Sequence, residues 1–318
     1  MSLPDPRIRN VGSPLTREML APLDPRCEVV QFSSLPTPRD LDRLAEFMEH
    51  HSDVALRAFG GYDGSIDDLE FLEHFPRLTR FRADALAYHD FNGIDGLRFL
   101  PDGVVDLSLG QVKRRYSLQP LARFTSLRKL SLEGSTWKDL DVISGLSTLE
   151  DLTLRSITLT DLSILRPLGH LRSLDLKLGG TRDLSMLPDL APLAYLELWM
   201  IRGLEDIAPV GELESLQYLF LQDLARVDRL PDMSRMTSLR RLELHNLKRL
   251  TDLTPLLTAP ALEELLLYNS AHLTPEHFEC LVGHPTLRKA VVGIGSKRKN
   301  EAVDRMLELP RPGEFVFR

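Results

Sequence analysis

The sequence predicts a repeat solenoid of the α/β class, in which short strands and tight turn segments alternate along the chain. A core of the form LxxLxL recurs ten times at steps of 22 to 26 residues, and such a regular period is typical of stacked repeats. Within one copy, LEDLTLRSITLTDLSILRPLGH, the apolar spacing changes from two to three, which no single helix or strand has. The cores begin at Leu78, Val104, Leu127, Leu149, Leu171, Leu193, Leu216, Leu239, Leu262 and Leu287.

Each copy contains two predicted elements. The alternating xxLxL part is a short strand whose leucines point inward and whose other residues point outward. The part that follows steps by three, which suits a 3₁₀-like or extended segment. One copy cannot bury its own apolar face, so neighbouring copies stack into a continuous core. Six copies carry an aspartate that we expect to accept backbone N–H bonds where this second part begins: Asp68, Asp139, Asp161, Asp183, Asp206 and Asp252.

These copies resemble the leucine-rich-repeat family, and most closely its short, internalin-like class with repeats of 22–23 residues. The resemblance implies a curved solenoid of about ten clear repeats, with a parallel sheet on the concave face and 3₁₀, extended or short helical segments on the convex face. That family usually places an asparagine in the turn after each strand. Here Asn246 and Asn269 come one residue early, so we expect the turns to differ.

The ends of an open solenoid need caps. We expect a Pro-rich, partly flexible segment over residues 1–27, an N-terminal cap over 28–77, the solenoid over 78–295 and a C-terminal cap over 296–318. The first cap should hold strands near 29–32 and 54–59 and a helix near 38–51, with Thr37 as its N-cap. Another helix should start at Thr274-Pro275. The second cap should hold a helix near 300–308, and the closing EFVFR should add a final strand to the sheet.

Composition narrows the classes of function. The formal net charge is −7 with 43% hydrophobic residues, whereas a nucleic-acid binder usually has a basic excess. Cys27 and Cys280 stand alone, so they form neither a zinc motif nor a disulfide framework. No stretch reaches the length of a membrane span or signal core. We therefore predict a bacterial, cytoplasmic protein with no cofactor, no metal, no nucleic-acid partner and no membrane association.

Outward strand positions change in character along the chain. In the copies that begin at 193, 216, 239 and 262, aromatic side chains stand beside charges on strands about 4.8 Å apart. Outward aromatics cannot serve the repeat core, and Tyr, Trp and Arg are enriched where proteins bind one another. We predict that the partner-binding residues are Tyr195, Glu197, Trp199, Tyr218, Phe220, Gln222, Arg241, Glu243, His245, Glu264, Leu266 and Tyr268.

The predicted function is a non-enzymatic scaffold that binds another protein or peptide on this surface. Two other interpretations of the surface stay open: a tail of the chain folds over it, or a second copy packs against it as a homo-oligomer. Functional alternatives are an immunity or inhibitor protein, which the family resemblance allows, and a hydrolase that uses His245 with Glu243 in the groove. The latter lacks support from any catalytic motif, and the spaced pair His277 and Cys280 is interpreted as structural.

Overall fold

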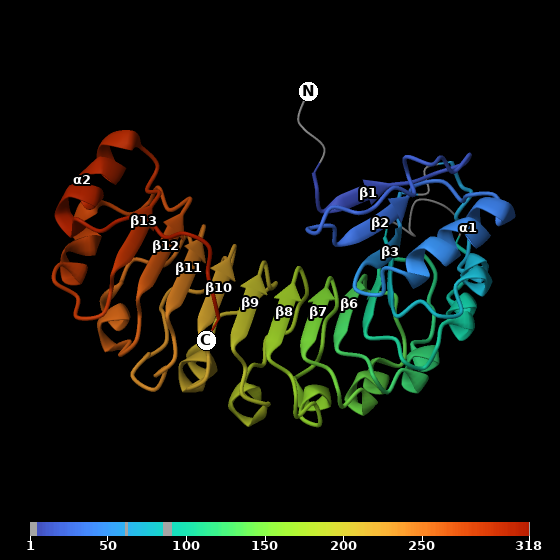
Figure 1. The fold of residues 1–318 in the computed structure, drawn as a ribbon. Coiled ribbons are helices and arrows are strands. Elements are labelled where there is room, and N and C mark those ends of the chain that lie inside the picture. The colour runs from blue at the N-terminus through green and yellow to red at the C-terminus, as the bar shows by residue number, and fades with distance from the viewer. Residues whose placement is uncertain (1–4, 61–62, 85–90, 318) are drawn as a thin grey trace. The chain divides into compact units, whose positions relative to one another are not determined.

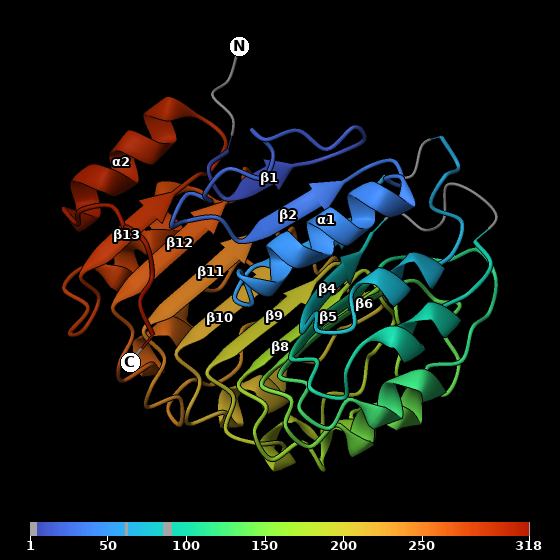
Figure 2. The same cartoon turned by 45° about the vertical axis from the view of Figure 1, so that its right-hand side comes forward.

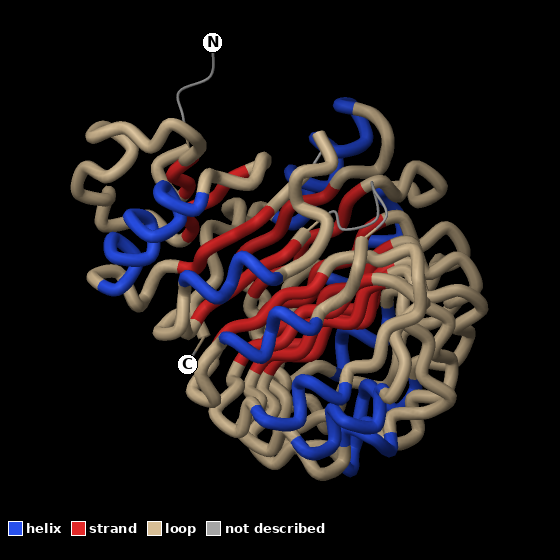
Figure 3. The backbone as a smooth tube through the Cα atoms, turned by 90° about the vertical axis from the view of Figure 1, so that its right-hand side faces the viewer, coloured by secondary structure: helices blue, strands red, loops and turns tan. Residues whose placement is uncertain are grey.

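The structure, a computed structural model, describes residues 5–60, 63–84 and 91–317. The chain divides into two compact units, residues 1–149 (unit 1) and residues 150–318 (unit 2). Each unit is a parallel sheet whose strands are neighbours in chain order, with short helical segments between strands. Figure 1 labels these elements, and Figure 3 separates the strands, in red, from the helical segments, in blue.

The strands described in unit 1 begin with a pairing that the sequence did not predict. Ile8 and Asn10 pair in parallel with Val29 and Gln31, so the Pro-rich segment adds an outer strand to the cap. The strands are β1 (Ile8–Asn10), β2 (Val29–Phe32), β3 (Ala55–Ala58), β4 (Arg80–Ala83), β5 (Asp106–Leu109) and β6 (Lys129–Glu133). The helical segments are α1 (Pro38–Glu49), η1 (Glu70–His74), η2 (Asp95–Phe99), η3 (Gln119–Arg123) and η4 (Leu140–Gly145).

Unit 2 has the more regular repeats, and its strands run side by side in the same direction (Figure 2). The strands are β7 (Asp151–Arg155), β8 (Ser173–Lys177), β9 (Tyr195–Trp199), β10 (Tyr218–Gln222), β11 (Arg241–His245), β12 (Glu264–Tyr268) and β13 (Lys289–Val292). The helical segments are η5 (Ser163–Leu165), η6 (Leu187–Asp189), η7 (Ala208–Glu212), η8 (Thr254–Thr258), η9 (Pro275–Leu281) and α2 (Lys297–Leu307).

Strand β10 shows how the alternation builds the core. Leu219 and Leu221 have no exposed surface, whereas Tyr218, Phe220 and Gln222 are half-buried on the other face. We call the face opposite the leucines the outward face. Burying a leucine side chain contributes about 1.5–3 kcal/mol, so a shift of register by one residue would expose the whole leucine set and is strongly disfavoured.

The predicted aspartate caps form in five of the six copies. Asp68, Asp161, Asp183, Asp206 and Asp252 each accept a bond from the backbone N–H two residues later, at N···O distances of 2.8–2.9 Å. Asp139 is the exception. Its backbone is left-handed, with φ of 58°, and its carboxylate accepts a bond from the Ser117 hydroxyl instead. The segments that follow these caps are short 3₁₀ helices or turns, as the spacing of three predicts.

The turn after each strand explains the displaced asparagines. The first residue after each of the strands β7 to β12 has a φ between 50° and 59°, a left-handed conformation that asparagine and aspartate tolerate better than most residues. From Ser156 to Asn246, the N–H of this residue bonds to the last carbonyl of the next strand. Backbone groups therefore form the ladder between turns. The residues in this position are Ser156, Leu178, Met200, Asp223, Asn246 and Asn269.

The predicted cap helices form with small changes. Helix α1 begins after Thr37, whose hydroxyl accepts the Asp40 N–H. The segment that starts at Pro275 is a 3₁₀ helix, held by a capping box between Thr274 and His277. Helix α2 begins at Lys297, three residues before the predicted start, because the Ser296 hydroxyl accepts the Lys299 N–H and caps it there.

The predicted final strand is wrong over the residues that the structure describes, and Arg318 lies outside them. Residues 309–317, which we call the tail, form no strand. Pro310 and Pro312 have no N–H to give to a strand ladder. The tail makes one sheet-like contact, in which the Pro310 carbonyl accepts the Ala290 N–H of β13 at 3.0 Å. From there the tail crosses the outward face of unit 2, where it passes over β11 in Figure 1.

Candidate functional site

Strand pairing aligns the predicted binding residues in three rows across β9 to β12. The first row holds Tyr195, Tyr218, Arg241 and Glu264. In the second row, Phe220 lies between Glu197 and Glu243, with Leu266 next to Glu243. The third row is Trp199, Gln222, His245 and Tyr268. All twelve predicted residues therefore lie on one outward face of unit 2, in the order that the repeat spacing predicts.

Two tyrosines of the first row form a pair, and the hydroxyl of each donates to a glutamate. The Tyr195 and Tyr218 rings meet edge to face at 5.1 Å between centroids. The Tyr195 hydroxyl donates to Glu197 at 3.0 Å, and the Tyr218 hydroxyl donates to Glu243. Burial, followed by the charge of Glu197, raises the pKa of Tyr195, and burial, followed by the bond to Glu243, raises the pKa of Tyr218. Both phenols stay neutral donors, so the pair is a fixed, largely apolar surface.

A second ring cluster covers the second and third rows. His245 packs against Phe220 at 5.0 Å and against Tyr268 at 4.8 Å between ring centroids. Trp199 donates its indole N–H to Asp223 at 3.3 Å, and the Arg155 guanidinium lies 5.1 Å from the centre of its ring. We call the six rings Tyr195, Trp199, Tyr218, Phe220, His245 and Tyr268 the aromatic patch.

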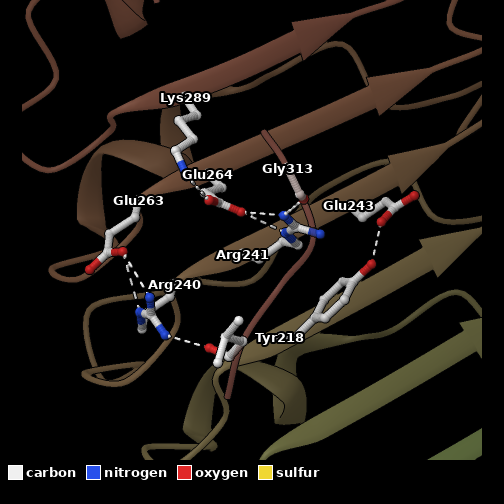
Figure 4. A network of polar contacts seen from close by, with 9 residues as sticks. Tyr218, Arg240, Arg241, Glu243, Glu263, Glu264, Lys289 and Gly313 are labelled. Atoms are coloured by element: carbon white, nitrogen blue, oxygen red, sulfur yellow. Dashed lines mark hydrogen bonds and ion pairs between the residues drawn. The ribbon is translucent and has the colours of Figure 1, made fainter. Parts of the chain in front are cut away.

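Buried ion pairs hold the first row in place (Figure 4). Arg241 is 6% exposed and donates to Glu264 at 2.7 Å, and Lys289 donates to the other oxygen of Glu264 at 2.8 Å. Burial alone would raise the pKa of Glu264, but bonds from Lys289 and Arg241 outweigh it and lower that pKa. Both carboxylate oxygens are therefore occupied within the chain, which makes Glu264 a support for Arg241.

Glu197 is in the opposite electrostatic state. It is 6% exposed, and Lys177 lies 2.8 Å from its carboxylate. Burial, followed by a hydrogen bond with Asp175, raises the pKa of Glu197 although Lys177 opposes the shift. The carboxyl groups of Asp175 and Glu197 therefore share one lysine at the edge of the aromatic patch.

The tail covers part of this surface, which is one of the interpretations that the sequence left open. Phe315 packs edge to face on Tyr218 at 5.1 Å, and Phe317 lies 6.4 Å from Tyr195. Arg240 donates to the Val316 carbonyl at 3.0 Å, and Arg241 donates to the Gly313 carbonyl at 2.6 Å. Arg240 was absent from the predicted set. Its position beside Arg241 in the same copy was the signal that could have included it.

His245 and Glu243 lie side by side, as the hydrolase alternative requires. His245 Nε2 lies 2.7 Å from Glu243 Oε1. The neighbouring His245 imidazole and the bond from the Tyr218 hydroxyl outweigh burial and lower the pKa of Glu243. The rings of Phe220 and Tyr268 flank the imidazole on both sides. Among the residues that the structure describes, no group of three or more His, Cys, Asp or Glu side chains could hold a metal ion.

The other candidate pair, His277 and Cys280, makes its contacts with backbone groups. His277 Nδ1 accepts the Thr274 N–H at 3.1 Å, and the Cys280 thiol lies near the His277 carbonyl at 3.6 Å. These bonds occupy the imidazole nitrogen in the cap of η9.

Within residues 5–60, 63–84 and 91–317, none of the helices is both long enough and apolar enough to span a bilayer.

Comparison with known proteins supports the fold. No family model matches the sequence, and no curated protein matches it. An internalin (inlF) from Listeria monocytogenes is similar in structure, with 18% sequence identity, a TM-score of 0.58 and coverage of 94% of this chain and 84% of that one. A leucine-rich-repeat protein from Leptospira interrogans is also similar, with 16% identity, a TM-score of 0.51 and coverage of 90% and 89%. The chain therefore has the leucine-rich-repeat fold that its periodicity predicts.

Proposed function

We propose that the protein binds another protein through the aromatic patch of unit 2. The observation that carries this proposal is the placement of six ring side chains on one outward face, away from the leucine core. The repeat fold does not need them there, because the same face of β8 carries Ser173, Asp175 and Lys177 instead. Clusters of outward aromatics beside charges are typical of protein interfaces.

The chemistry of the patch favours a partner with cationic and apolar groups. Aromatic faces attract guanidinium and ammonium groups, and Glu243 lies among the rings. Phe220 and Trp199 lie in the rows that the tail contacts do not include. These two side chains supply apolar area that a partner can bury without first displacing the tail. We therefore expect them to be central to binding.

A capture experiment tests the proposal. The native lysate is passed over the immobilised wild type and over Trp199→Ala/Phe220→Ala, and captured proteins are identified by mass spectrometry. A specific partner should be retained by the wild type and lost by the double variant. The matched control is Leu257→Ala/Val282→Ala, which truncates two exposed apolar residues (47% and 55% exposed) outside the patch. Equal capture by all three folded proteins would reject the patch as the binding site.

The same experiment separates the scaffold from the inhibitor alternative. If the captured partner is an enzyme or toxin, its activity is assayed with and without the wild type. An inhibitor abolishes that activity in proportion to binding, whereas a scaffold leaves turnover intact and changes only where the partner is located. A captured second copy of this chain would show a homo-oligomeric interface.

A further inference from the structure

We propose that the tail is an intramolecular ligand, and that the patch recognises an extended partner segment with two aromatic side chains two residues apart. This inference rests on the proposed function and specifies the partner's chemistry. The tail has the sequence LPRPGEFVF, and its Phe315 and Phe317 are the two aromatic residues. In extended backbone, alternate side chains point to the same side, so both rings can reach the sheet at once.

The tail crosses the strands so that one ring meets one strand. Phe315 packs on Tyr218 of β10, and Phe317 lies by Tyr195 of β9. The two phenylalanine rings also contact each other at 5.0 Å. Two extended residues span roughly 6.6 Å and neighbouring strands lie about 4.8 Å apart. An extended segment that crosses the sheet obliquely therefore presents successive alternate side chains to successive strands.

The polar contacts of the tail carry little sequence information. Arg240 and Arg241 donate to backbone carbonyls of Val316 and Gly313, and any extended peptide offers such carbonyls. Their guanidinium groups also lie 5.3 Å and 5.0 Å from the centre of the Phe315 ring. The two arginines therefore favour an extended backbone that places an aromatic side chain between them. Selectivity among peptide sequences comes from the positions of the aromatic rings.

The tail fills its site incompletely. Phe317 is 49% exposed and Val316 is 72% exposed. An open cavity of about 460 Å³ lies between the two phenylalanines and the sheet, where its other lining residues are Asp151, Arg172, Ser173, Ala194, Tyr195, Gln217 and Tyr218. A cavity of this volume is in the range of ligand sites. A partner segment with a larger side chain at the place of Phe317 would bury more surface than the tail does, and would displace it.

A peptide-binding measurement tests this inference without the natural partner. The probe is a fluorescently labelled peptide of sequence LPRPGEFVF, and its anisotropy is followed with the wild type and with Phe315→Ala/Phe317→Ala. In the wild type, the tethered tail competes at an effective concentration on the order of millimolar. If the tail is docked in nine of ten molecules, the peptide should bind the double variant about tenfold more tightly than the wild type.

Three controls define the outcome. A peptide with alanine in place of both phenylalanines should bind at least tenfold more weakly to the double variant. Tyr195→Ala, added to the double variant, should weaken binding of the intact peptide, because Tyr195 lines the cavity at which the tail docks. Val316→Ala should behave like the wild type, because its side chain points to solvent and only its carbonyl bonds to Arg240.

The inference is overturned if the peptide binds the wild type and the double variant equally, or binds neither up to millimolar concentration. It is also overturned if the alanine peptide binds as well as the intact one. Phe315 is half-buried and Phe317 is exposed, and neither belongs to the leucine core, so the double variant should fold, as checked by circular dichroism. None of these outcomes depends on Trp199 or Phe220, so a negative result leaves the capture experiment as an independent test of the proposed function.

Discussion

Glu197 and Glu264 show how two buried carboxyl groups on one sheet face reach opposite electrostatic states. Glu264 accepts hydrogen bonds from two cations, Arg241 and Lys289, and its pKa is lowered. Glu197 shares Lys177 with Asp175, and burial raises its pKa. The repeat places both residues at outward positions, so only the neighbouring side chains distinguish them. Partner binding at this face would bury both further.

These opposite shifts predict opposite pH dependences of stability. A carboxyl group whose folded pKa is lowered stabilises the fold above its unfolded pKa, and this contribution is lost as the pH falls through the folded value. Glu264→Gln should therefore lose less of its free energy of unfolding than the wild type does when the pH falls below the usual glutamate pKa of 4.5. The measurement is the urea midpoint as a function of pH, followed by circular dichroism.

Glu197→Gln is the matched variant with the reverse sign. A raised folded pKa means that the contribution of Glu197 is present below its unfolded pKa and is lost as the pH rises through the folded value. The variant should therefore gain stability relative to the wild type as the pH rises above 4.5. Parallel pH profiles for both variants and the wild type would contradict the assigned shifts.

At the scale of the element, the left-handed residue after each of the strands β7 to β12 is the least expected feature of the repeat. Asp223, Asn246 and Asn269 suit that conformation, whereas Leu178 and Met200 do not. A left-handed backbone costs most L-residues roughly 1–2 kcal/mol. The apolar residues therefore carry strain that asparagine would relieve, and asparagine occurs one residue earlier than in the usual family pattern for this reason.

Met200→Asn should therefore stabilise the protein. Met200 is 45% exposed with a φ of 50°, so the change relieves backbone strain and removes little core packing. We expect a gain of up to about 1 kcal/mol in the free energy of unfolding, measured by urea denaturation. Met200→Val is the control, since a β-branched residue tolerates this conformation poorly. Equal effects of the two substitutions would contradict backbone strain at Met200.

The alternation within a strand makes a second prediction at this scale. Leu219→Ala should cost about 2–5 kcal/mol, because the side chain is fully buried between repeats. Phe220→Ala, one residue later on the outward face, should cost about 1 kcal/mol, chiefly from its contact with His245. Urea denaturation of both variants compares them directly. A larger loss for Phe220→Ala would show that the inward and outward faces are assigned wrongly.

Sequence periodicity was sufficient to predict the strands of the repeats, the alignment of the outward residues in rows and five of the six expected aspartate caps, because each depends on a local pattern that repeats. It was insufficient where a choice depends on distant residues. The apolar Phe315 and Phe317 could have paired at the edge of β13 or docked on the face. Pro310 and Pro312 remove two N–H donors from the first option, and the half-buried rings of Tyr195 and Tyr218 offer an aromatic surface for the second.

At the scale of the whole molecule, the fold that this chain shares with other proteins does not determine which side chains lie on its outward face. The similar solved structures have only 16–18% identical residues, so the same fold forms from largely different sequences. The boundary between units at residues 149 and 150 falls within the run of repeats, where the period of 22 residues continues unchanged. Spacing alone therefore could not predict it. The whole aromatic patch and the tail lie within unit 2.

The most direct test of the central claim is the affinity of the captured partner for the purified wild type and for Trp199→Ala/Phe220→Ala, measured by isothermal titration calorimetry. Hot-spot residues near the centre of an interface cost at least about 2 kcal/mol each when truncated, and such losses are not additive. We therefore predict that the double variant binds at least about 100-fold more weakly, which corresponds to about 2.8 kcal/mol. Leu257→Ala/Val282→Ala should retain the wild-type affinity. An unchanged affinity in a folded Trp199→Ala/Phe220→Ala variant would contradict binding at the aromatic patch.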